Sequence, residues 1–368
     1  MTLDIRLQKV ADKAMQGESG AVIIMNPKTG ELLALASFPD FDPNLFSGGI
    51  DQENWNILLE NPEHPLENKA IQGLYAPGSI FKIVTAYAGL DLEVLTPETE
   101  HVCNGLFHVK GRETPFKCWK ENGHGRVALI DAIKGSCNVY FYNTGMGVGV
   151  DAMHKYSGLF GLGQLTGLGL LNEKAGLVPS SNWKQRVLNE PWYLGEMPSM
   201  AIGQGYIIVT PLQVLNMINI LANDGMWIPP NLLLDQEGIS PQHIPLKREY
   251  LSLIREGMVA VVNEVGGTAR KVQFEEFTVA GKTATSQVVS HETLETLDNE
   301  TKSKREIQNH AWFVAFGPVE DPEISALALV EHGGGGSKAA APIVRKVLSF
   351  YICLLYTSPS PRDLSTSR

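Results

Sequence analysis

Ser79 and Lys82 are the two residues whose types and spacing point most directly to chemistry. They follow Pro77 and Gly78, which favour a turn, and they begin an apolar run that is typical of a helix. A lysine three residues after a serine lies one helical turn further on the same face. A serine hydroxyl becomes a nucleophile when a neighbouring base takes its proton, and a lysine with a lowered pKa can be that base. Because a capped surface helix often has the same two residues, the pair needs support from elsewhere in the chain.

Ser136 and Asn138 fit such a pair, because they flank a break between two helical patterns that is marked by Gly135. A turn at this break projects both side chains to one side. We expect the Ser136 hydroxyl to relay a proton to or from Lys82. The Asn138 amide would hold Lys82 and a substrate carbonyl. Taken alone, however, the motif also fits an ordinary serine at a helix break.

A third group, Lys282, Thr283 and Thr285, lies on a predicted strand, where Lys282 and Ala284 point one way and the two threonines the other. A strand beside a cleft can pair its backbone with an extended peptide. The hydroxyl and ammonium groups would then hold the peptide's carboxylate. On its own, this group too is compatible with a structural role.

Composition narrows the class of protein. The chain has 368 residues, a net charge of −10 and 43% apolar residues, which is enough for a large core. The acidity argues against nucleic acid as a partner, because no basic tract offsets it. No run of 18 apolar residues predicts a membrane span, and the first residues show no secretory signal. We therefore expect either a cytoplasmic protein or a piece of a longer one.

Strand patterns from both ends of the chain enclose a helical middle. The strands are predicted at 21–25, 32–36, 277–285, 312–316 and 324–330, and the helices include 128–148, 150–162 and 211–223. These patterns predict an α+β fold, in which an antiparallel sheet from both chain ends receives an inserted helical subdomain. Residues 290–308 are predicted to be a loop, and 353–368 a disordered or non-native tail after the domain 1–352.

The order of Ser-x-x-Lys, Ser-x-Asn and Lys-Thr-x-Thr resembles the motif set of β-lactamases and penicillin-binding proteins. Within these groups, the chain is most similar to the transpeptidase domain of class B penicillin-binding proteins of the elongation type, penicillin-binding protein 2. The resemblance covers about residues 1–350. It also rests on the stretches 2–8, 41–46, 68–70, 119–125 and 203–206. It implies the penicillin-binding, serine-β-lactamase-like transpeptidase fold.

The same resemblance implies peptidoglycan D,D-transpeptidation. Ser79 would attack the penultimate D-alanyl carbonyl of a stem peptide and carry the acyl group until an acceptor amine resolves it. Lys82 would act as the base, Ser136 as the relay and Asn138 as the positioning group. Lys282, Thr283 and Thr285 would bind the donor carboxylate, and the N–H groups of Ser79 and Thr285 would form the oxyanion hole. β-Lactams would acylate Ser79, and catalysis would need no cofactor.

Members of this family carry an N-terminal membrane anchor and a pedestal domain, neither of which is present in this chain. The resemblance therefore implies a full-length protein at the periplasmic face of the bacterial cytoplasmic membrane. Its expected partners are peptidoglycan stem peptides, β-lactams, a SEDS-type glycosyltransferase and the cell-elongation machinery, with no nucleic acid.

One position departs from the family pattern, because Ala284 stands where glycine is usual. Glycine lets a strand backbone and its substrate approach closely. The added methyl group would narrow the cleft if it points there, and would have little effect if it points into the sheet. We expect activity to survive.

Three cysteines and a histidine, Cys103, Cys118, His124 and Cys137, form a candidate metal site. A closed Cys₃His set suits structural, tetrahedral Zn²⁺. The alternatives are one disulfide with a free thiol, or three buried cysteines. Because Cys137 is the middle residue of the Ser-x-Asn turn, a metal would attach residues 103–125 to that turn.

Two further interpretations of the function remain open. A serine β-lactamase or D,D-carboxypeptidase shares the acylation groups but resolves the acyl-enzyme with water. A non-catalytic β-lactam sensor or scaffold would keep the fold without the chemistry. Covalent labelling by a penicillin separates the enzymes from a scaffold, and the lifetime of the adduct separates the enzymes from one another.

Overall fold

The fold is built on one antiparallel sheet whose strands come from both ends of the chain, as predicted. A computed structural model describes residues 1–234, 240–275, 277–288, 297, 301 and 304–357. The five strands lie in the order β2 (Leu32–Phe38), β1 (Gly20–Met25), β11 (Ile324–Val330), β10 (His310–Gly317) and β9 (Ala280–Ser286). Ile23 of β1 lies opposite both Leu35 of β2 and Leu327 of β11. The sheet is therefore complete only when strands from both ends of the chain pair.

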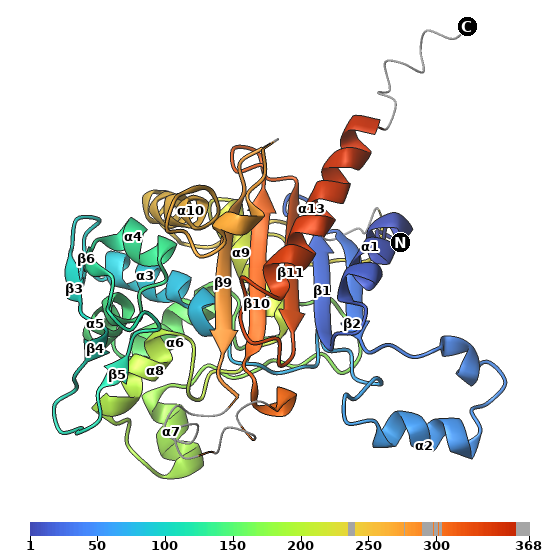
Figure 1. Ribbon diagram of the computed structural model, residues 1–368, viewed down its shortest axis with the longest axis horizontal. Helices are drawn as coiled ribbons and strands as arrows, with labels where there is room; N and C mark the ends of the chain where they lie inside the picture. Colours follow the sequence, from blue (N-terminus) through green and yellow to red (C-terminus); the bar gives the residue numbers. More distant parts are fainter. Residues whose placement is uncertain (235–239, 276, 289–296, 298–300, 302–303, 358–368) are drawn as a thin grey trace, which may run out of the picture.

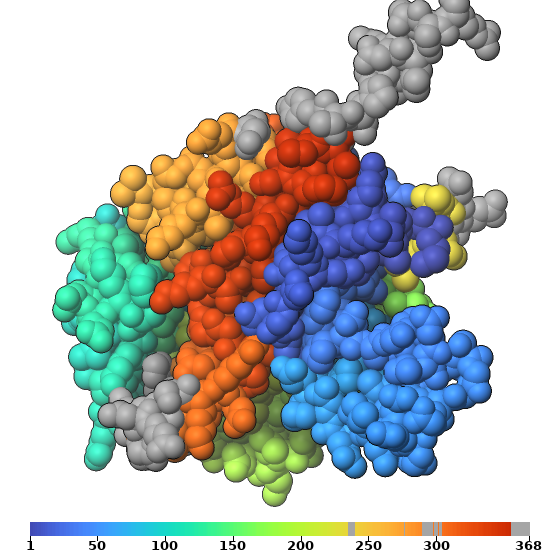
Figure 2. Space-filling view, turned by 45° about the vertical axis from the view of Figure 1, so that its right-hand side comes forward, coloured from blue at the N-terminus to red at the C-terminus, as the bar shows by residue number. Residues whose placement is uncertain are grey.

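Helices cover both faces of this sheet. On one face, α1 (Ile5–Met15) and α13 (Ala340–Thr357) lie side by side, and α9 (Pro211–Ala222) packs against the other (Figures 1 and 2). Every residue of α9 is buried, and every residue of β1 and β11 as well. Continuously apolar strands are expected where both faces of a sheet are covered. The helix α10 (Arg248–Asn263) packs beside β9, the edge strand.

The helical subdomain lies beside β9 (Figure 1). Its helices are α3 (Lys82–Asp91), α4 (Leu129–Lys134), α5 (Asn138–Val148), α6 (Val150–Leu159), α7 (Ser181–Leu188) and α8 (Met197–Ala201). Short strand pairs extend from it, formed by β3 (His101–Cys103) with β6 (Gly125–Val127) and by β4 (Leu106–Phe107) with β5 (Phe116–Lys117). The predicted α+β architecture with an inserted helical subdomain is confirmed.

The remaining elements lie at the periphery. They are α2 (Gln52–Glu60), the pair β7 (Met226–Trp227) and β8 (Gln242–His243), and the short 3-10 helices Pro43–Phe46, Leu194–Glu196, Arg270–Val272 and Arg305–Ile307. The helix α2 and its flanking loops form a lobe that stands away from the sheet (Figures 1 and 2).

Two predicted boundaries need comment. The disordered or non-native tail is predicted to begin at 353, but α13 continues to Thr357, and residues 358–368 lie outside the described part. Most of the predicted loop 290–308 also lies outside it, although Arg305–Ile307 are helical. Within the described residues, no helix is both long enough and apolar enough to cross a membrane.

Candidate active site

Ser79 lies in a tight turn that leads into α3. Gly78, Ser79 and Ile80 form one 3-10 turn, and Lys82 is the first residue of the α-helix. Gly78 has a φ of +53°, and a Cβ there would lie 3.0 Å from the Thr285 carbonyl oxygen. Glycine is therefore required where the turn approaches β9. The predicted helix start is confirmed, with a 3-10 turn at its beginning.

The side chain of Lys82 is completely buried and binds the Ser-x-Asn turn. Its Nζ donates to the Ser136 carbonyl at 2.9 Å, to the Ser136 hydroxyl at 3.1 Å and to Asn138 Oδ1 at 2.7 Å. Burial lowers the pKa of Lys82 to about 8, against an opposing influence of the nearby thiols of Cys137 and Cys118. Among the hydrogen bonds of the described residues, none joins Lys82 to the Ser79 hydroxyl.

Ser136 lies between two lysines. Its hydroxyl also accepts a hydrogen bond of 3.0 Å from Lys282 Nζ, which donates as well to the Thr283 carbonyl at 3.1 Å. Burial and the positive charge of Lys82 hold the pKa of Lys282 well below its usual range. Ser136 has a φ of +51°, a conformation that costs energy for a non-glycine residue. The turn thus holds one hydroxyl in contact with two amines of lowered pKa.

A cleft of about 640 Å³ opens over these groups. The described residues that line it include Ser79, Ser136, Asn138, Gln204, Thr268, Thr283, Thr285, Asn309 and Gly335–Ser337. Lys82 and Lys282 are not among the lining residues, because both are buried behind Ser136. The lysines therefore reach the cleft through residues that line it: both bind the Ser136 hydroxyl, and Lys82 also binds Asn138.

The edge strand β9 presents backbone groups to the cleft. The Thr285 carbonyl accepts a hydrogen bond of 3.3 Å from Gln204 Nε2 of the helical subdomain. In an antiparallel pair, a residue directs its N–H and its C=O to the same side. The Thr285 N–H therefore also points away from β10 and toward the cleft. Thr283 Oγ1 lies 2.7 Å from Thr268 Oγ1.

Ala284 is only 3% exposed, and its methyl group lies under the turn that carries Ser79. A Cβ on Gly78 would be 3.4 Å from the Ala284 Cβ. The methyl group therefore fills space between β9 and the turn, and Ala284 also belongs to the lining of the cleft. The survival of activity with alanine at this position stays a prediction.

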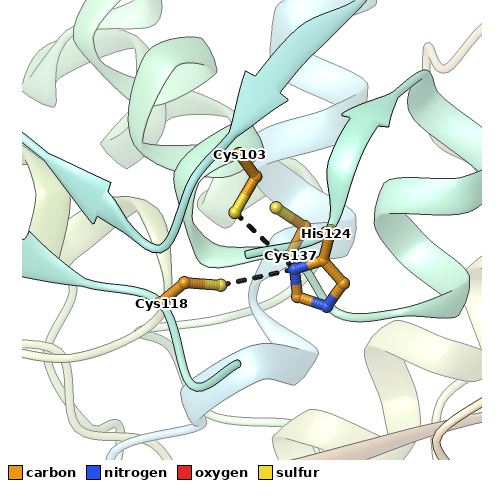
Figure 3. Close-up of side chains that lie close together, drawn as sticks. All are labelled: Cys103, Cys118, His124 and Cys137. Carbon is orange, nitrogen blue, oxygen red and sulfur yellow. Dashed lines mark hydrogen bonds between the residues drawn. The ribbon is translucent and has the colours of Figure 1, made fainter. Parts of the chain in front are cut away.

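The predicted metal ligands converge (Figure 3). The ligand atoms of Cys103, Cys118, His124 and Cys137 all lie within 4.8 Å of one another. His124 Nδ1 is 3.7 Å from Cys103 Sγ and 3.5 Å from Cys118 Sγ. All three cysteines are buried, and none forms a disulfide. Hydrogen bonding from Cys137 and His124 lowers the pKa of the Cys118 thiol.

This cluster is joined to the Ser-x-Asn turn by hydrogen bonds as well as through Cys137. His124 Nε2 lies 3.1 Å from the Gly135 carbonyl oxygen. Trp119 Nε1 donates to the Gly135 and Ser136 carbonyls at 3.1 and 3.0 Å. The segment 118–124 therefore supports the backbone of the turn that holds Lys82.

Trp119, Gln204 and Thr268 are among the cleft residues for which the sequence predicts no role. Gln204 stands between Gly203 and Gly205, and such glycine-flanked polar residues mark close backbone approaches. Thr268 follows two glycines in a stretch without a motif, so its contact with Thr283 depends on the tertiary fold.

Comparison with known proteins assigns this fold to a family. The model of the penicillin binding protein transpeptidase domain matches residues 20–349. This chain belongs to that family of transpeptidase domains. Peptidoglycan D,D-transpeptidase MrdA of Haemophilus influenzae is 36% identical over 363 residues, which are 96% of this chain and 56% of the relative. The protein of the same name in Acinetobacter baumannii is also 36% identical, and the match covers 93% of this chain and 52% of that relative. The chain thus spans just over half the length of these relatives.

Solved structures agree with this assignment. Pseudomonas aeruginosa PBP2 in complex with WCK 5153 has a TM-score of 0.87 and 34% identity, covering 100% of this chain and 78% of that one. The complex between PBP2 and MreC from Helicobacter pylori also has a TM-score of 0.87 and 34% identity. The match covers 95% of this chain and 63% of the other. The fold and family expected from the motifs are confirmed.

Proposed function

We propose that this domain is the catalytic part of a peptidoglycan D,D-transpeptidase that works through an acyl-enzyme on Ser79. The main support is that buried Lys82 contacts Ser136 and Asn138, close to Ser79, which lines the cleft. Buried lysines with a lowered pKa are suited to act as bases. The names of the relatives support the same activity.

In the first half-reaction, Ser79 Oγ forms a bond to the penultimate D-alanyl carbonyl carbon while its proton moves to the Lys82 amine. The C–N bond to the terminal D-alanine then breaks, and the leaving amine takes a proton from Lys82 through the Ser136 hydroxyl. In the second half-reaction, an acceptor amine attacks the ester carbonyl. The C–O bond breaks, and the proton of that amine returns to Ser79.

The other assigned groups hold the substrate. The Thr285 N–H, which is directed toward the cleft, would form the oxyanion hole with the Ser79 N–H. Thr283 and Thr285 line the cleft and would bind the donor carboxylate through their hydroxyls. Lys282 would contribute from behind Ser136 through its positive charge and its hydrogen bond to the relay hydroxyl.

A two-part assay tests this function. A donor thioester that ends in a D-alanyl group should acylate Ser79, and addition of a D-amino acid amine should yield the amide product. A domain that releases only the hydrolysed acid, at any amine concentration, would instead be a carboxypeptidase. Rapid turnover of penicillin would identify a β-lactamase, and no acylation of folded protein would leave a scaffold or sensor.

We also propose that the cluster of Cys103, Cys118, His124 and Cys137 binds structural Zn²⁺. In tetrahedral Zn²⁺ sites, bonds of about 2.3 Å to sulfur and 2.0 Å to nitrogen place these atoms about 3.5 Å apart. The distances of 3.7 and 3.5 Å from His124 Nδ1 match this value. A hydrogen bond from His124 Nε2 to the Gly135 carbonyl would leave Nδ1 free to bind the metal.

Elemental analysis with thiol titration tests the metal. Purified protein should hold about one zinc per chain, and Cys137→Ser should lose it, whereas the exposed Cys353→Ser serves as a matched control and should keep it. Chelation should lower the melting temperature and slow acylation, because the cluster holds the Ser-x-Asn turn. A zinc-free, fully active protein with reactive thiols would contradict the proposal.

The setting of the full-length protein is proposed on the same basis. We place it at the periplasmic face of the cytoplasmic membrane, with a SEDS-type glycosyltransferase and the elongation machinery as partners. Support comes from the solved complex of a PBP2 with MreC and from a structurally similar peptidoglycan synthase complex. Co-purification of the full-length protein with a membrane glycosyltransferase would test this setting.

A further inference from the structure

Ser286, the last residue of β9, has a buried side chain to which the reaction described above gives no role. It directly follows Thr285, whose N–H is one of the two proposed oxyanion donors. Trp312 Nε1 of β10 donates to Ser286 Oγ at 2.8 Å. Ser286 Oγ in turn donates to the carbonyl of Ala76, three residues before Ser79. These two hydrogen bonds join β10, β9 and the segment that leads to the nucleophile.

The direction of both hydrogen bonds follows from the chemistry of the groups. An indole N–H can only donate, and a backbone carbonyl can only accept. The Ser286 hydroxyl must therefore accept from Trp312 and give its own proton to Ala76. Trp312 is fully buried and Ser286 is 1% exposed, so water does not compete for either group. The hydroxyl cannot rotate without breaking one of its two bonds, and it therefore holds the Ala76 carbonyl at a fixed position.

Strand alternation explains why Ser286 reaches this segment. Ala284 and Ser286 are two residues apart on β9, so their side chains point to the same face of the strand. The Ala284 Cβ lies 3.4 Å from the position of a Cβ on Gly78, and Ser286 binds Ala76, two residues earlier. Two side chains on one face of β9 thus contact the segment before Ser79, one by packing and one by a hydrogen bond.

Backbone hydrogen bonds hold the same segment from another direction. The Gly78 N–H donates to the Gly203 carbonyl at 2.9 Å, and Tyr75 and Val209 exchange two hydrogen bonds of 3.0 and 2.9 Å. Among the hydrogen bonds of the described residues, the one that joins residues 75–81 to β9 is that of Ser286 to the Ala76 carbonyl. The position of the turn relative to β9 therefore depends on this hydroxyl.

That position sets the spacing of the proposed oxyanion hole. Its two N–H groups belong to different elements, because Ser79 lies in the turn and Thr285 in β9. Both N–H groups must lie within hydrogen-bond distance of the same oxygen in the transition state. A shift of the turn away from β9 would lengthen one of these bonds. Lys82 has its own contacts with Ser136 and Asn138, so its pKa should depend little on such a shift.

We propose that Ser286 is a positioning residue that sets the distance between the two halves of the oxyanion hole, and that Trp312 fixes the direction in which its hydroxyl donates. Ser286 is not among the described residues that line the cleft, so it acts through the Ala76 carbonyl and the turn. This inference rests on the proposed function, because it requires acylation of Ser79.

Rapid mixing with benzylpenicillin tests this role, because it separates the dissociation constant of the noncovalent complex from the rate constant for acylation. Ser286→Ala should leave the dissociation constant unchanged and slow acylation about tenfold, as expected when an oxyanion donor is displaced. The apparent pKa of the acylation rate should stay where it is in the unmodified protein, because Lys82 keeps its contacts. Trp312→Phe should slow acylation by a smaller factor of about three, since the hydroxyl remains but loses the donor that orients it.

Ser325→Ala is the matched control. Ser325 is a fully buried serine of β11 in the same sheet, and its hydroxyl donates to the Met25 carbonyl at 3.2 Å. This variant also loses a buried hydroxyl-to-carbonyl bond, but Ser325 does not line the cleft, and the acylation rate constant should be that of the unmodified protein. Each variant is measured well below its melting temperature.

The outcomes separate the positioning role from the proposed function. An acylation rate constant that is unchanged in Ser286→Ala, equally reduced in Ser325→Ala, or reduced together with a shifted apparent pKa would overturn the positioning role alone. If Ser286→Ala does not fold, Trp312→Phe is judged by the same criteria. The absence of a Ser79 adduct in the unmodified protein would overturn the proposed function and the positioning role together.

Discussion

Lys82 Nζ contacts both oxygens of Ser136, the carbonyl at 2.9 Å and the hydroxyl at 3.1 Å. The Lys82 amine thereby holds the backbone of the Ser-x-Asn turn and also donates a hydrogen bond to the Ser136 hydroxyl. Since Lys282 contacts the same hydroxyl, Ser136 is the cleft residue that both buried amines share.

The first prediction concerns the pH dependence of acylation. Lys82 must be unprotonated to accept the Ser79 proton, and its pKa is lowered to about 8. The rate constant for acylation by a penicillin should therefore rise with pH and level off above about 8, falling tenfold per pH unit well below that value. Stopped-flow acylation rates between pH 5 and 9 measure this profile. A rate that stays constant down to pH 6 would show that another group is the base.

Ser136→Ala should remove the relay while keeping the turn, because the carbonyl contact with Lys82 remains. We expect acylation to slow by a factor of about 10² to 10⁴, which is typical for loss of a proton-transfer group. Ser47→Ala, in an exposed loop, is the matched control and should be unchanged. If Ser136→Ala kept the unmodified rate with an unchanged melting temperature, the relay would be refuted.

Substitutions at Ala284 and Gly78, which lie next to each other in the fold, should have very different effects on the acylation rate. Ala284→Gly should change the acylation rate by less than about threefold, because the Ala284 side chain is only 3% exposed, although the residue lines the cleft. It should lower stability by about 1 kcal/mol, because a strand loses a packed side chain and gains backbone entropy.

Gly78→Ala should reduce acylation strongly, because its Cβ would press on the Thr285 carbonyl at 3.0 Å in a left-handed conformation. Acylation rates and thermal unfolding of the two variants are the relevant measurements. A faster Ala284→Gly enzyme would mean that the methyl group obstructs the substrate.

The protein should lose folding stability in acid because His310 is buried in its neutral form. Burial and the neighbouring His332 lower its pKa to about 4, and its Nδ1 accepts a hydrogen bond of 3.1 Å from the His332 N–H. Because the folded pKa lies below the unfolded value of about 6.5, stability is complete above pH 6.5 and declines as the pH falls toward 4. This ring should account for about 2 to 3 kcal/mol between these limits.

Denaturant unfolding of His310→Gln at pH 7 and pH 4 checks this linkage. The variant should show a smaller difference between the two pH values than the unmodified protein. His154→Gln, a histidine that contacts the Val178 carbonyl elsewhere, should keep the full difference. An unchanged acid dependence in His310→Gln would assign the effect to other groups.

Much of the fold was predictable because the relevant signals are local. Alternation and apolar runs in the sequence depend only on the burial of each strand. They predict β1, β2, β10 and β11, and therefore a sheet formed by both ends of the chain. The three motifs predicted that Ser79, Ser136 and Thr283 lie together, and all three line one cleft. The Cys–His cluster was predictable from residue types alone.

Other features depend on distant contacts that no local pattern carries. The burial of Lys282 behind Ser136 results from how β9 packs on the helical subdomain, so its exclusion from the cleft lining could not be read from the strand. The alternation of the strand sets the direction of the Ala284 methyl group, but its contact with the turn at Gly78 joins residues that lie far apart in the sequence. Lys184 is fully buried and donates to both Glu196 oxygens at 2.6 and 2.7 Å, and this pairing joins two elements that are distinct in the sequence.

Identification of the residue that carries the acyl group tests the central claim most directly. The protein, Ser79→Ala and the control Ser47→Ala are incubated with benzylpenicillin, and their intact masses and peptide maps are measured. We predict one stable penicilloyl adduct on Ser79 in the unmodified protein and in Ser47→Ala, and none in Ser79→Ala. An adduct that persists in folded Ser79→Ala, or its absence from the unmodified protein, would contradict the account.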